Sequence, residues 1–61
     1  MNIPLVFGQA LKRWRKARHL TQAELAAQTG YSLSTIRKLE SGVLRPSRQV
    51  ARRLSDVLQL S

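Results

Sequence analysis

The sequence predicts an all-α domain made of four short helices in a compact bundle. Apolar residues recur at steps of three and four, as they do on one face of a helix. Serine or threonine precedes three of these stretches as an N-cap, and glycine follows two of them. No segment alternates apolar and polar residues in the manner of a half-buried strand. The 61 residues suffice for one domain, and the lack of cysteine with a single histidine excludes disulfides and a zinc site.

The first helix is predicted from Leu5 to Arg18, because Phe7, Leu11 and Trp14 share one face at helical spacing. Pro4 suits the first turn, where a backbone N–H has no partner within the helix. We expect Trp14 to belong to the core. The opposite face is basic and carries Lys12, Arg13, Lys16 and Arg18. We expect this face to steer a polyanion over a distance more than to contact it.

The second helix is predicted from Gln22 to Thr29. Thr21 precedes it as the N-cap, and Glu24 stands three positions later, which makes a capping box. Gly30 follows the helix, as expected for a residue in the left-handed conformation. Only Gly30 and Tyr31 then separate this helix from the next N-cap.

The third helix is predicted from Leu33 to Ser41, with Ser32 as its N-cap and Gly42 at its end. A fourth helix is predicted from Arg48 to Leu58 after the N-cap Ser47. Two capped helices joined by a tight glycine turn are typical of a helix-turn-helix. The sequence therefore places such a motif between residues 21 and 42.

The charge balance indicates a polyanionic partner. Eleven Lys and Arg residues face three acids, which gives a net charge of +8 and opposes compactness through self-repulsion. Nucleic acid and an anionic membrane both fit this charge. No apolar run approaches the ~20 residues that span a bilayer, and no secretion signal is recognisable. We therefore expect a cytoplasmic protein.

The segment from Leu20 to Gly42, LTQAELAAQTGYSLSTIRKLESG, resembles the phage-repressor/Cro family. The likeness extends to Leu11–Arg15, which is similar to the first helix of that family, and to Pro46-Ser47 and the later Leu-x-x-x-Leu pattern, which are similar to its fourth. It covers the chain from about residue 7 to residue 61. It implies a repressor-like DNA-binding domain of bacterial or phage origin that binds double-stranded DNA, with a homodimer on DNA or in a full-length protein.

The resemblance also implies roles for individual residues. The third helix would lie in the major groove and read base edges through Leu33, Ser34, Arg37 and Lys38. Phosphate contacts would come from Gln22, Ser32, Thr35, Ser41, Gly42, Arg45 and Arg48. Chemistry supports part of this assignment, because a guanidinium such as that of Arg37 can grip O6 and N7 of guanine. Leu33 suits contact with a thymine methyl group.

Two further expectations follow from the resemblance. Arg15 and Glu40 match positions that often form a partly buried ion pair in that family, so we assign Glu40 a structural role. His19 stands where the family usually has glycine, and we expect it to adopt the strained left-handed conformation.

Other functions are weighed on the same residues. An enzyme is disfavoured, because no catalytic constellation, phosphate-cradling loop, cofactor motif or metal-ligand set is present in the sequence. A protein-interaction module in a larger signalling protein is the main alternative, since fold does not fix function. Membrane association through the basic first helix ranks last, because its apolar face is needed for a core.

The extent of the domain stays open on the sequence alone. Ser61 is placed as the N-cap of a fifth helix, so the chain is either a four-helix domain or a five-helix domain cut short. The opening of the chain is similar to the N-terminal modules of larger bacterial regulators. Dimerisation and effector sensing would then depend on further domains.

Overall fold

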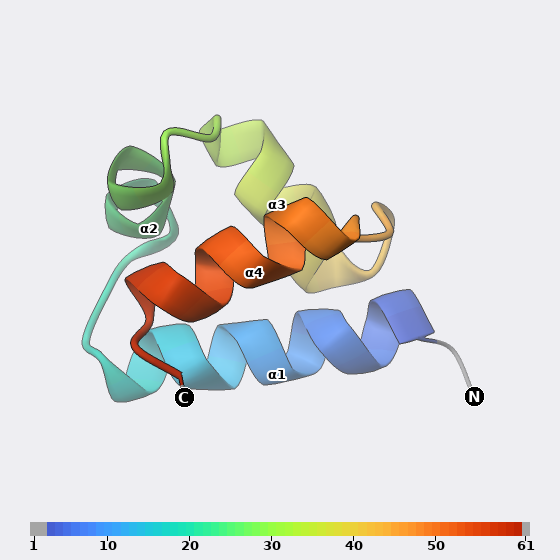
Figure 1. Cartoon of the computed structure of the whole chain (residues 1–61), viewed down its shortest axis with the longest axis horizontal. Coiled ribbons are helices and arrows are strands. Elements are labelled where there is room, and N and C mark those ends of the chain that lie inside the picture. The colour runs from blue at the N-terminus through green and yellow to red at the C-terminus, as the bar shows by residue number, and fades with distance from the viewer. Residues whose placement is uncertain (1–2, 61) are drawn as a thin grey trace.

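Four helices and no strand make up the described part of the chain, residues 3–60 of the computed structural model. The all-α prediction is therefore confirmed. The helices are α1 (Ile3–Ala17), α2 (Gln22–Thr29), α3 (Leu33–Ser41) and α4 (Arg48–Val57). Figure 1 shows α1 along the bottom of the molecule, with α2 and α3 above it and α4 overlapping α3 in this view. α3 packs against both α1 and α2, and α4 packs against α2.

The predicted helix limits hold for α2 and α3 and shift slightly for the other two. α1 begins at Ile3 rather than Leu5, with Pro4 in its first turn, where the ring disrupts no intrahelical hydrogen bond. It ends at Ala17, because the next residues form a turn in which His19 has a φ of 57°. The left-handed conformation expected for His19 is thus confirmed. Leu58 lies at the C-cap of α4 rather than inside it.

Each end of the helix-turn-helix has its own cap. Thr21 Oγ1 accepts a hydrogen bond from the Glu24 N–H at 3.0 Å, and Glu24 Oε1 accepts one from the Thr21 N–H at 2.8 Å. This is the predicted capping box. Gly30 and Gly42 follow α2 and α3 with φ values of 80° and 82°, a region that glycine enters without strain. Local chemistry therefore sets where both helices begin and end.

The core is small and consists mainly of leucine. Its fully buried side chains come from all four helices and the residue after α4: Leu11, Leu25, Ile36, Leu39, Leu54 and Leu58, with Thr29 beside them. Trp14 is half-buried at the edge of this cluster, so the expectation of a core tryptophan holds only in part. Its ring meets that of Phe7 edge to face, with the centroids 6.5 Å apart.

Ser61, the expected cap of a fifth helix, lies outside the described residues. Among residues 3–60, no helix is long and apolar enough to cross a membrane.

Candidate nucleic-acid interface

α3 has one buried and one exposed face. Ile36, Leu39 and Glu40 are buried against the other helices. Ser34, Arg37 and Lys38, three of the four expected base-reading residues, are exposed. The fourth, Leu33, is half-buried at the start of the helix. The helix therefore presents a polar, basic surface that is backed by the core.

The hydroxyl groups at the start of α3 are engaged with one another. Ser32 Oγ accepts the Thr35 N–H at 3.0 Å and lies 2.9 Å from Thr35 Oγ1. These bonds stabilise the first turn of the helix. The two residues assigned to phosphate contact thus lie together, and the cap already uses part of their hydrogen-bonding capacity.

The donors at the end of α3 are also engaged. Ser41 Oγ donates to the carbonyl of Lys38 at 3.1 Å, and the Gly42 N–H donates to the carbonyl of Leu39 at 3.3 Å. The Leu44 N–H closes the end of the helix on the Lys38 carbonyl at 3.1 Å. A phosphate oxygen at this point has to compete with these internal acceptors.

Arg45 and Arg48, by contrast, are exposed on the loop after α3 and at the start of α4. The only ion pair among residues 3–60 joins Arg15 and Glu40, so neither exposed arginine is neutralised by a described acid. Their charges remain available for an anion.

The Arg15 and Glu40 side chains meet in the interior between α1 and α3. Arg15 Nε lies 2.6 Å from Glu40 Oε2, and Arg15 Nη2 lies 3.2 Å from Glu40 Oε1. The side chains are 9% and 4% exposed. Arg15 Nη1 donates in addition to the carbonyl of Leu20 at 2.7 Å. A two-point contact of this kind fixes both groups.

Gln22, the first residue of α2, points toward this pair. Its Nε2 donates to Glu40 Oε1 at 3.1 Å, and the side chain is half-buried. The structure thus brings Gln22, Arg15 and Glu40 together, although the sequence assigned Gln22 to the phosphate contacts and the other two to an ion pair.

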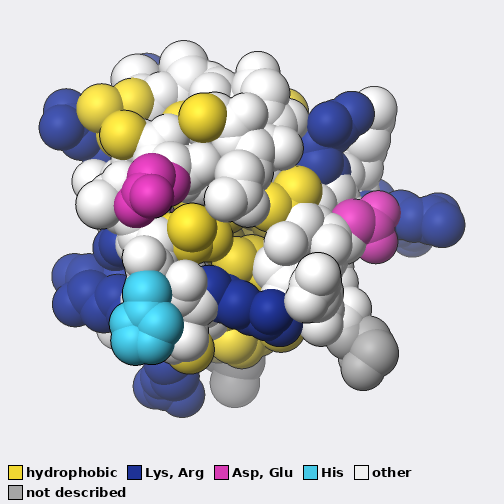
Figure 2. All heavy atoms as spheres, turned by 90° about the vertical axis from the view of Figure 1, so that its left-hand side faces the viewer, with side chains coloured by type: hydrophobic (Ala, Val, Ile, Leu, Met, Phe, Trp, Pro, Cys, Tyr) yellow, Lys and Arg dark blue, Asp and Glu magenta, His cyan; other side chains and the backbone are white. Residues whose placement is uncertain are grey.

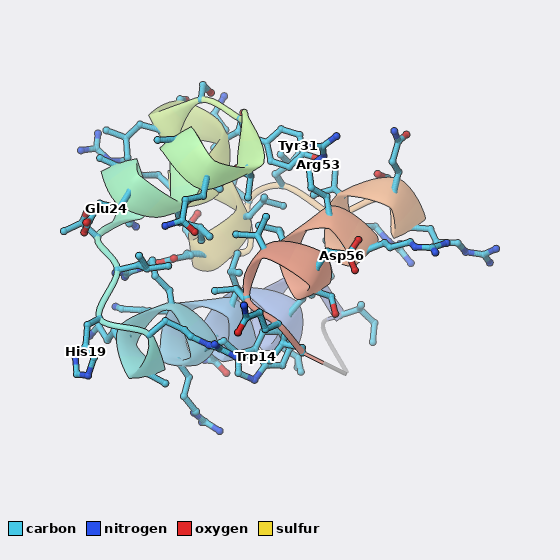
Figure 3. All side chains as sticks on the ribbon, turned by 60° about the vertical axis from the view of Figure 1, so that its left-hand side comes forward. Trp14, His19, Glu24, Tyr31, Arg53 and Asp56 are labelled. Atoms are coloured by element: carbon cyan, nitrogen blue, oxygen red, sulfur yellow. The ribbon has the colours of Figure 1, made fainter. Side chains whose placement is uncertain are left out.

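The sequence analysis did not predict the contact of Arg53 with Thr29 and Tyr31. Arg53 Nη1 donates to the carbonyl of Thr29 at 3.2 Å, and its guanidinium lies 6.0 Å from the centre of the Tyr31 ring. Figure 3 shows Tyr31 and Arg53 side by side between the motif and α4. The positive charge of Arg53 thus lies at the C-terminus of α2, where a cation is favourable. Since these residues are far apart in sequence, no local pattern indicates this contact.

Acidic side chains are few and separated on the face shown in Figure 2, whereas Lys and Arg side chains occupy much of its rim. Glu24 belongs to the capping box. Its hydrogen bonds from the backbone and side chain of Thr21 hold the pKa of the carboxyl below its usual value. Glu24 therefore remains charged at the start of α2.

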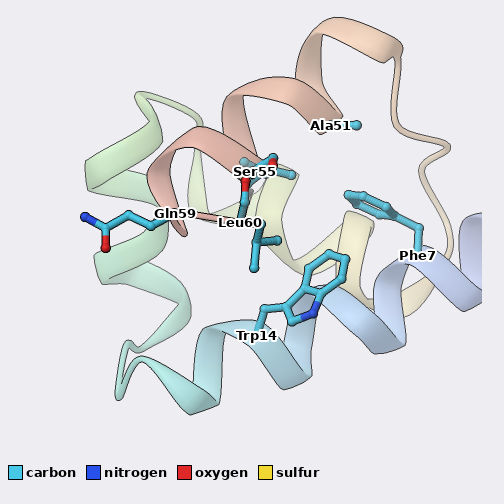
Figure 4. Close-up of a pocket in the computed structure, with 7 residues that line it drawn as sticks. Phe7, Trp14, Ala51, Ser55, Gln59 and Leu60 are labelled. Atoms are coloured by element: carbon cyan, nitrogen blue, oxygen red, sulfur yellow. Dashed lines mark hydrogen bonds between the residues drawn. The ribbon is translucent and has the colours of Figure 1, made fainter.

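A shallow groove of about 620 Å³ lies between α1 and α4 (Figure 4). Phe7 and Trp14 line one side of it, and Ala51, Ser55 and Leu60 lie on the other. The lining has no ionisable side chain, and no cluster of three potential metal ligands occurs among the described residues. The groove therefore offers none of the groups that acid–base or metal chemistry requires.

The fold and the exposed face of α3 define a small helical domain with a helix-turn-helix, a class of structure that binds DNA. A family model described as helix-turn-helix matches residues 11–61. The chain belongs to this family, the helix-turn-helix domains of the Cro and phage-repressor type, which are DNA-binding regulators. Comparisons with curated proteins and with solved structures gave no match.

Proposed function

We propose that this domain binds double-stranded DNA in a sequence-specific manner, with α3 in the major groove, and that it regulates transcription. The observation that carries the proposal is the two-sided character of α3. Arg37 and Lys38 are exposed, while Ile36 and Leu39 in the same turns are fully buried and hold the helix in place. A major groove admits one helix, and a rigidly held helix can present its side chains to base edges.

Arg37 is the principal reading residue in this proposal, because a guanidinium fits the two acceptors of guanine. Lys38 and Ser34 lie on the same exposed face and reach neighbouring bases. Leu33 contributes its exposed part to a thymine methyl group. Occupancy of the site then excludes or recruits the transcription machinery.

Phosphate contacts hold the domain in register on the duplex. Arg45 and Arg48 are exposed cations without a described acidic partner, and they lie just beyond the C-terminus of α3. The N-termini of α2 and α3 add backbone N–H groups and a partial positive charge. Such contacts position the helix but do not select sequence. The other expected phosphate-contacting residues of α3 already make hydrogen bonds within the helix caps, so we propose that they contribute less than the two arginines. These residues are Ser32, Thr35, Ser41 and Gly42.

A second copy on the neighbouring half-site, about one helical turn away, is part of the proposal. Several exposed apolar side chains gather near one edge: Ile3 and Val6 in α1 are 50% and 45% exposed, and Val43 in the loop after α3 is 77% exposed. The backbone of Leu5 lies about 3.0 Å from where a Cβ atom on Gly42 would be, so these two segments are neighbours. An apolar edge next to Arg45 suits contact with a protein bound to the same duplex.

The decisive experiment is the selection of bound sequences from a random duplex pool, followed by binding measurements over a range of salt concentrations. A recovered consensus supports readout by α3. With Arg45 and Arg48 on phosphates, the logarithm of affinity should fall against the logarithm of salt with a slope of about −2 per protomer. Recovery of no consensus, with equal binding to all duplexes, would contradict sequence-specific binding. Failure to bind any duplex at low salt would favour the protein-interaction module instead.

A matched pair of variants distinguishes direct contact with a phosphate from the general effect of the positive charge of the domain. Arg45→Gln and Lys12→Gln each remove one positive charge, but Lys12 lies on the outer face of α1. Only Arg45→Gln should reduce the salt slope, by about one unit. Equal slopes for the two variants would show that the loop after α3 does not touch phosphate.

A further inference from the structure

The side-chain amide of Gln22 is bonded to the most deeply buried acid of the domain. Its Nε2 donates to Glu40 Oε1 at 3.1 Å, and the same oxygen accepts Arg15 Nη2 at 3.2 Å. The other carboxylate oxygen, Oε2, accepts Arg15 Nε at 2.6 Å. Glu40 therefore receives three hydrogen bonds, one of which comes from the first residue of α2.

This contact fixes which way the Gln22 amide faces. An ionised carboxylate can only accept hydrogen bonds, so the nitrogen of the amide and not its oxygen must face Glu40. One of the two amide N–H groups is used in this way. Because the amide group is planar, this bond also fixes the direction of the second N–H, which can donate to another acceptor, such as a phosphate oxygen.

Arg15 makes such an arrangement compatible with DNA. A lone carboxylate next to the start of α2 would repel a phosphate that approaches there, whereas the guanidinium balances that charge. Arg15 also donates to the Leu20 carbonyl at 2.7 Å, directly before the N-cap Thr21. The buried pair therefore holds both the chain that enters α2 and the first side chain of that helix.

Leu33, the first residue of α3, has an aliphatic side chain and offers Gln22 no hydrogen bond, whereas Glu40 bonds to the Gln22 amide. We propose that Glu40, held by Arg15, is a positioning residue for DNA binding: it presets the Gln22 amide to donate to a phosphate at the N-terminus of α2. This inference rests on the proposed function, and it extends the role of Glu40 beyond the stability of the core.

The test replaces the whole pair, because removal of one partner alone would leave an unpaired buried charge and should destabilise the domain strongly. In Arg15→Met/Glu40→Met, two flexible apolar side chains fill the same space, and such replacements of buried pairs are often neutral or stabilising. The net charge is unchanged, so long-range attraction to DNA is matched. We expect a folded variant whose affinity for the selected duplex is about 2- to 10-fold lower, because Gln22 must now be ordered on binding. The salt slope should stay the same, since no cation leaves a phosphate.

A double-mutant cycle assigns the loss to Gln22. Gln22→Ala should weaken binding in the wild-type background and should cost little more in the Met/Met background. Ser55→Ala, which removes a hydrogen bond to the Leu60 carbonyl away from the motif, is the control for a general loss of stability. It should lower the thermal midpoint without lowering affinity. Full additivity of Gln22→Ala with the Met/Met pair would overturn the inference.

A measurement on the wild-type protein does not depend on the folding of any variant. The two side-chain amide protons of Gln22 should give separate, well-dispersed NMR signals and exchange slowly with solvent if the amide is held by Glu40. Signals typical of an exposed glutamine would contradict the preset orientation. If wild-type protein binds no duplex, the proposed function fails. If wild type binds but Gln22→Ala binds equally well, only this inference fails.

Discussion

A Cβ atom on Gly8 would lie 2.5 Å from the carbonyl oxygen of Glu40, so the backbones of α1 and α3 cross in direct contact at this point. The carbonyl of Leu39 is equally close. Both neighbours are backbone atoms inside a helix, which cannot move aside as the end of a flexible side chain can. The absence of a side chain at Gly8 therefore sets the distance at which α3 rests on α1.

The first prediction concerns this crossing. In most helix interiors Gly→Ala stabilises by about 0.5–1 kcal/mol, but Gly8→Ala should destabilise the domain by at least about 1–3 kcal/mol because the helices must move apart. The measurement is urea unfolding followed by circular dichroism. Gln9→Ala, on the exposed neighbour in α1, is the control and should change stability by less than about 0.5 kcal/mol. A more stable Gly8→Ala variant would show that the crossing is looser than this distance indicates.

The buried pair gives the second prediction. Arg15→Ala or Glu40→Ala leaves an uncompensated charge in the core, which costs about 3–5 kcal/mol. A domain of this size has a total stability of about the same magnitude, so both single variants should be largely unfolded at 25 °C. The helical circular dichroism signal and the thermal midpoint measure this directly. Midpoints unchanged from the wild type in both variants would contradict a structural role for the pair.

The Arg15–Glu40 pair was expected from the family resemblance, whereas the crossing at Gly8 was not predicted from the sequence. The helix limits of α2 and α3 follow from caps and glycines within a few residues, so local chemistry was enough to predict them. The close pass at Gly8 and the contact of Arg53 with Thr29 depend on how distant segments pack, and no spacing along the chain encodes them. The bond from Gln22 to Glu40 has the same origin. The exposed face of α3 could be predicted, because the helical spacing of its apolar residues matches the positions that are buried in the structure.

The third prediction distinguishes a contact with a base from a contact with a phosphate. Arg37→Ala should cost roughly 1–3 kcal/mol on the selected duplex and much less on random DNA, because it removes a contact to a base. Arg45→Ala should weaken binding to both duplexes by a similar factor, because phosphates are the same in every sequence. Titrations of both variants against both duplexes measure the four losses. Equal losses on both duplexes for Arg37→Ala would remove it from the reading residues.

The fourth prediction follows from the lowered pKa of Glu24. Hydrogen bonds from Thr21 favour the charged carboxyl in the folded state, so this contribution to stability is present above the ordinary pKa of about 4.5 and is lost as pH falls through the lower folded value. Glu24→Gln keeps an acceptor for the Thr21 N–H but cannot titrate. Its thermal midpoint should therefore fall less than that of the wild type between pH 7 and pH 3, on the order of a few degrees less.

Asp56→Asn is the matched control for that comparison, because Asp56 is an exposed acid outside the capping box. It should show nearly the same fall in midpoint as the wild type. If Glu24→Gln loses as much stability as the wild type on acidification, the Thr21–Glu24 box contributes nothing that depends on the charge.

The last prediction concerns the second copy. Two molecules that each carry a charge of +8 repel one another in free solution, and phosphates on DNA offset that repulsion. Pairing through the exposed apolar edge should therefore depend on DNA, with a monomer in sedimentation experiments and cooperative binding to two half-sites about one helical turn apart. Val43→Ser, which removes the most exposed apolar side chain of that edge, should reduce the cooperativity and leave binding to a single half-site unchanged. Equal cooperativity for Val43→Ser and the wild type would place the contact between copies elsewhere, and independent filling of the two half-sites by the wild type would contradict pairing on DNA altogether.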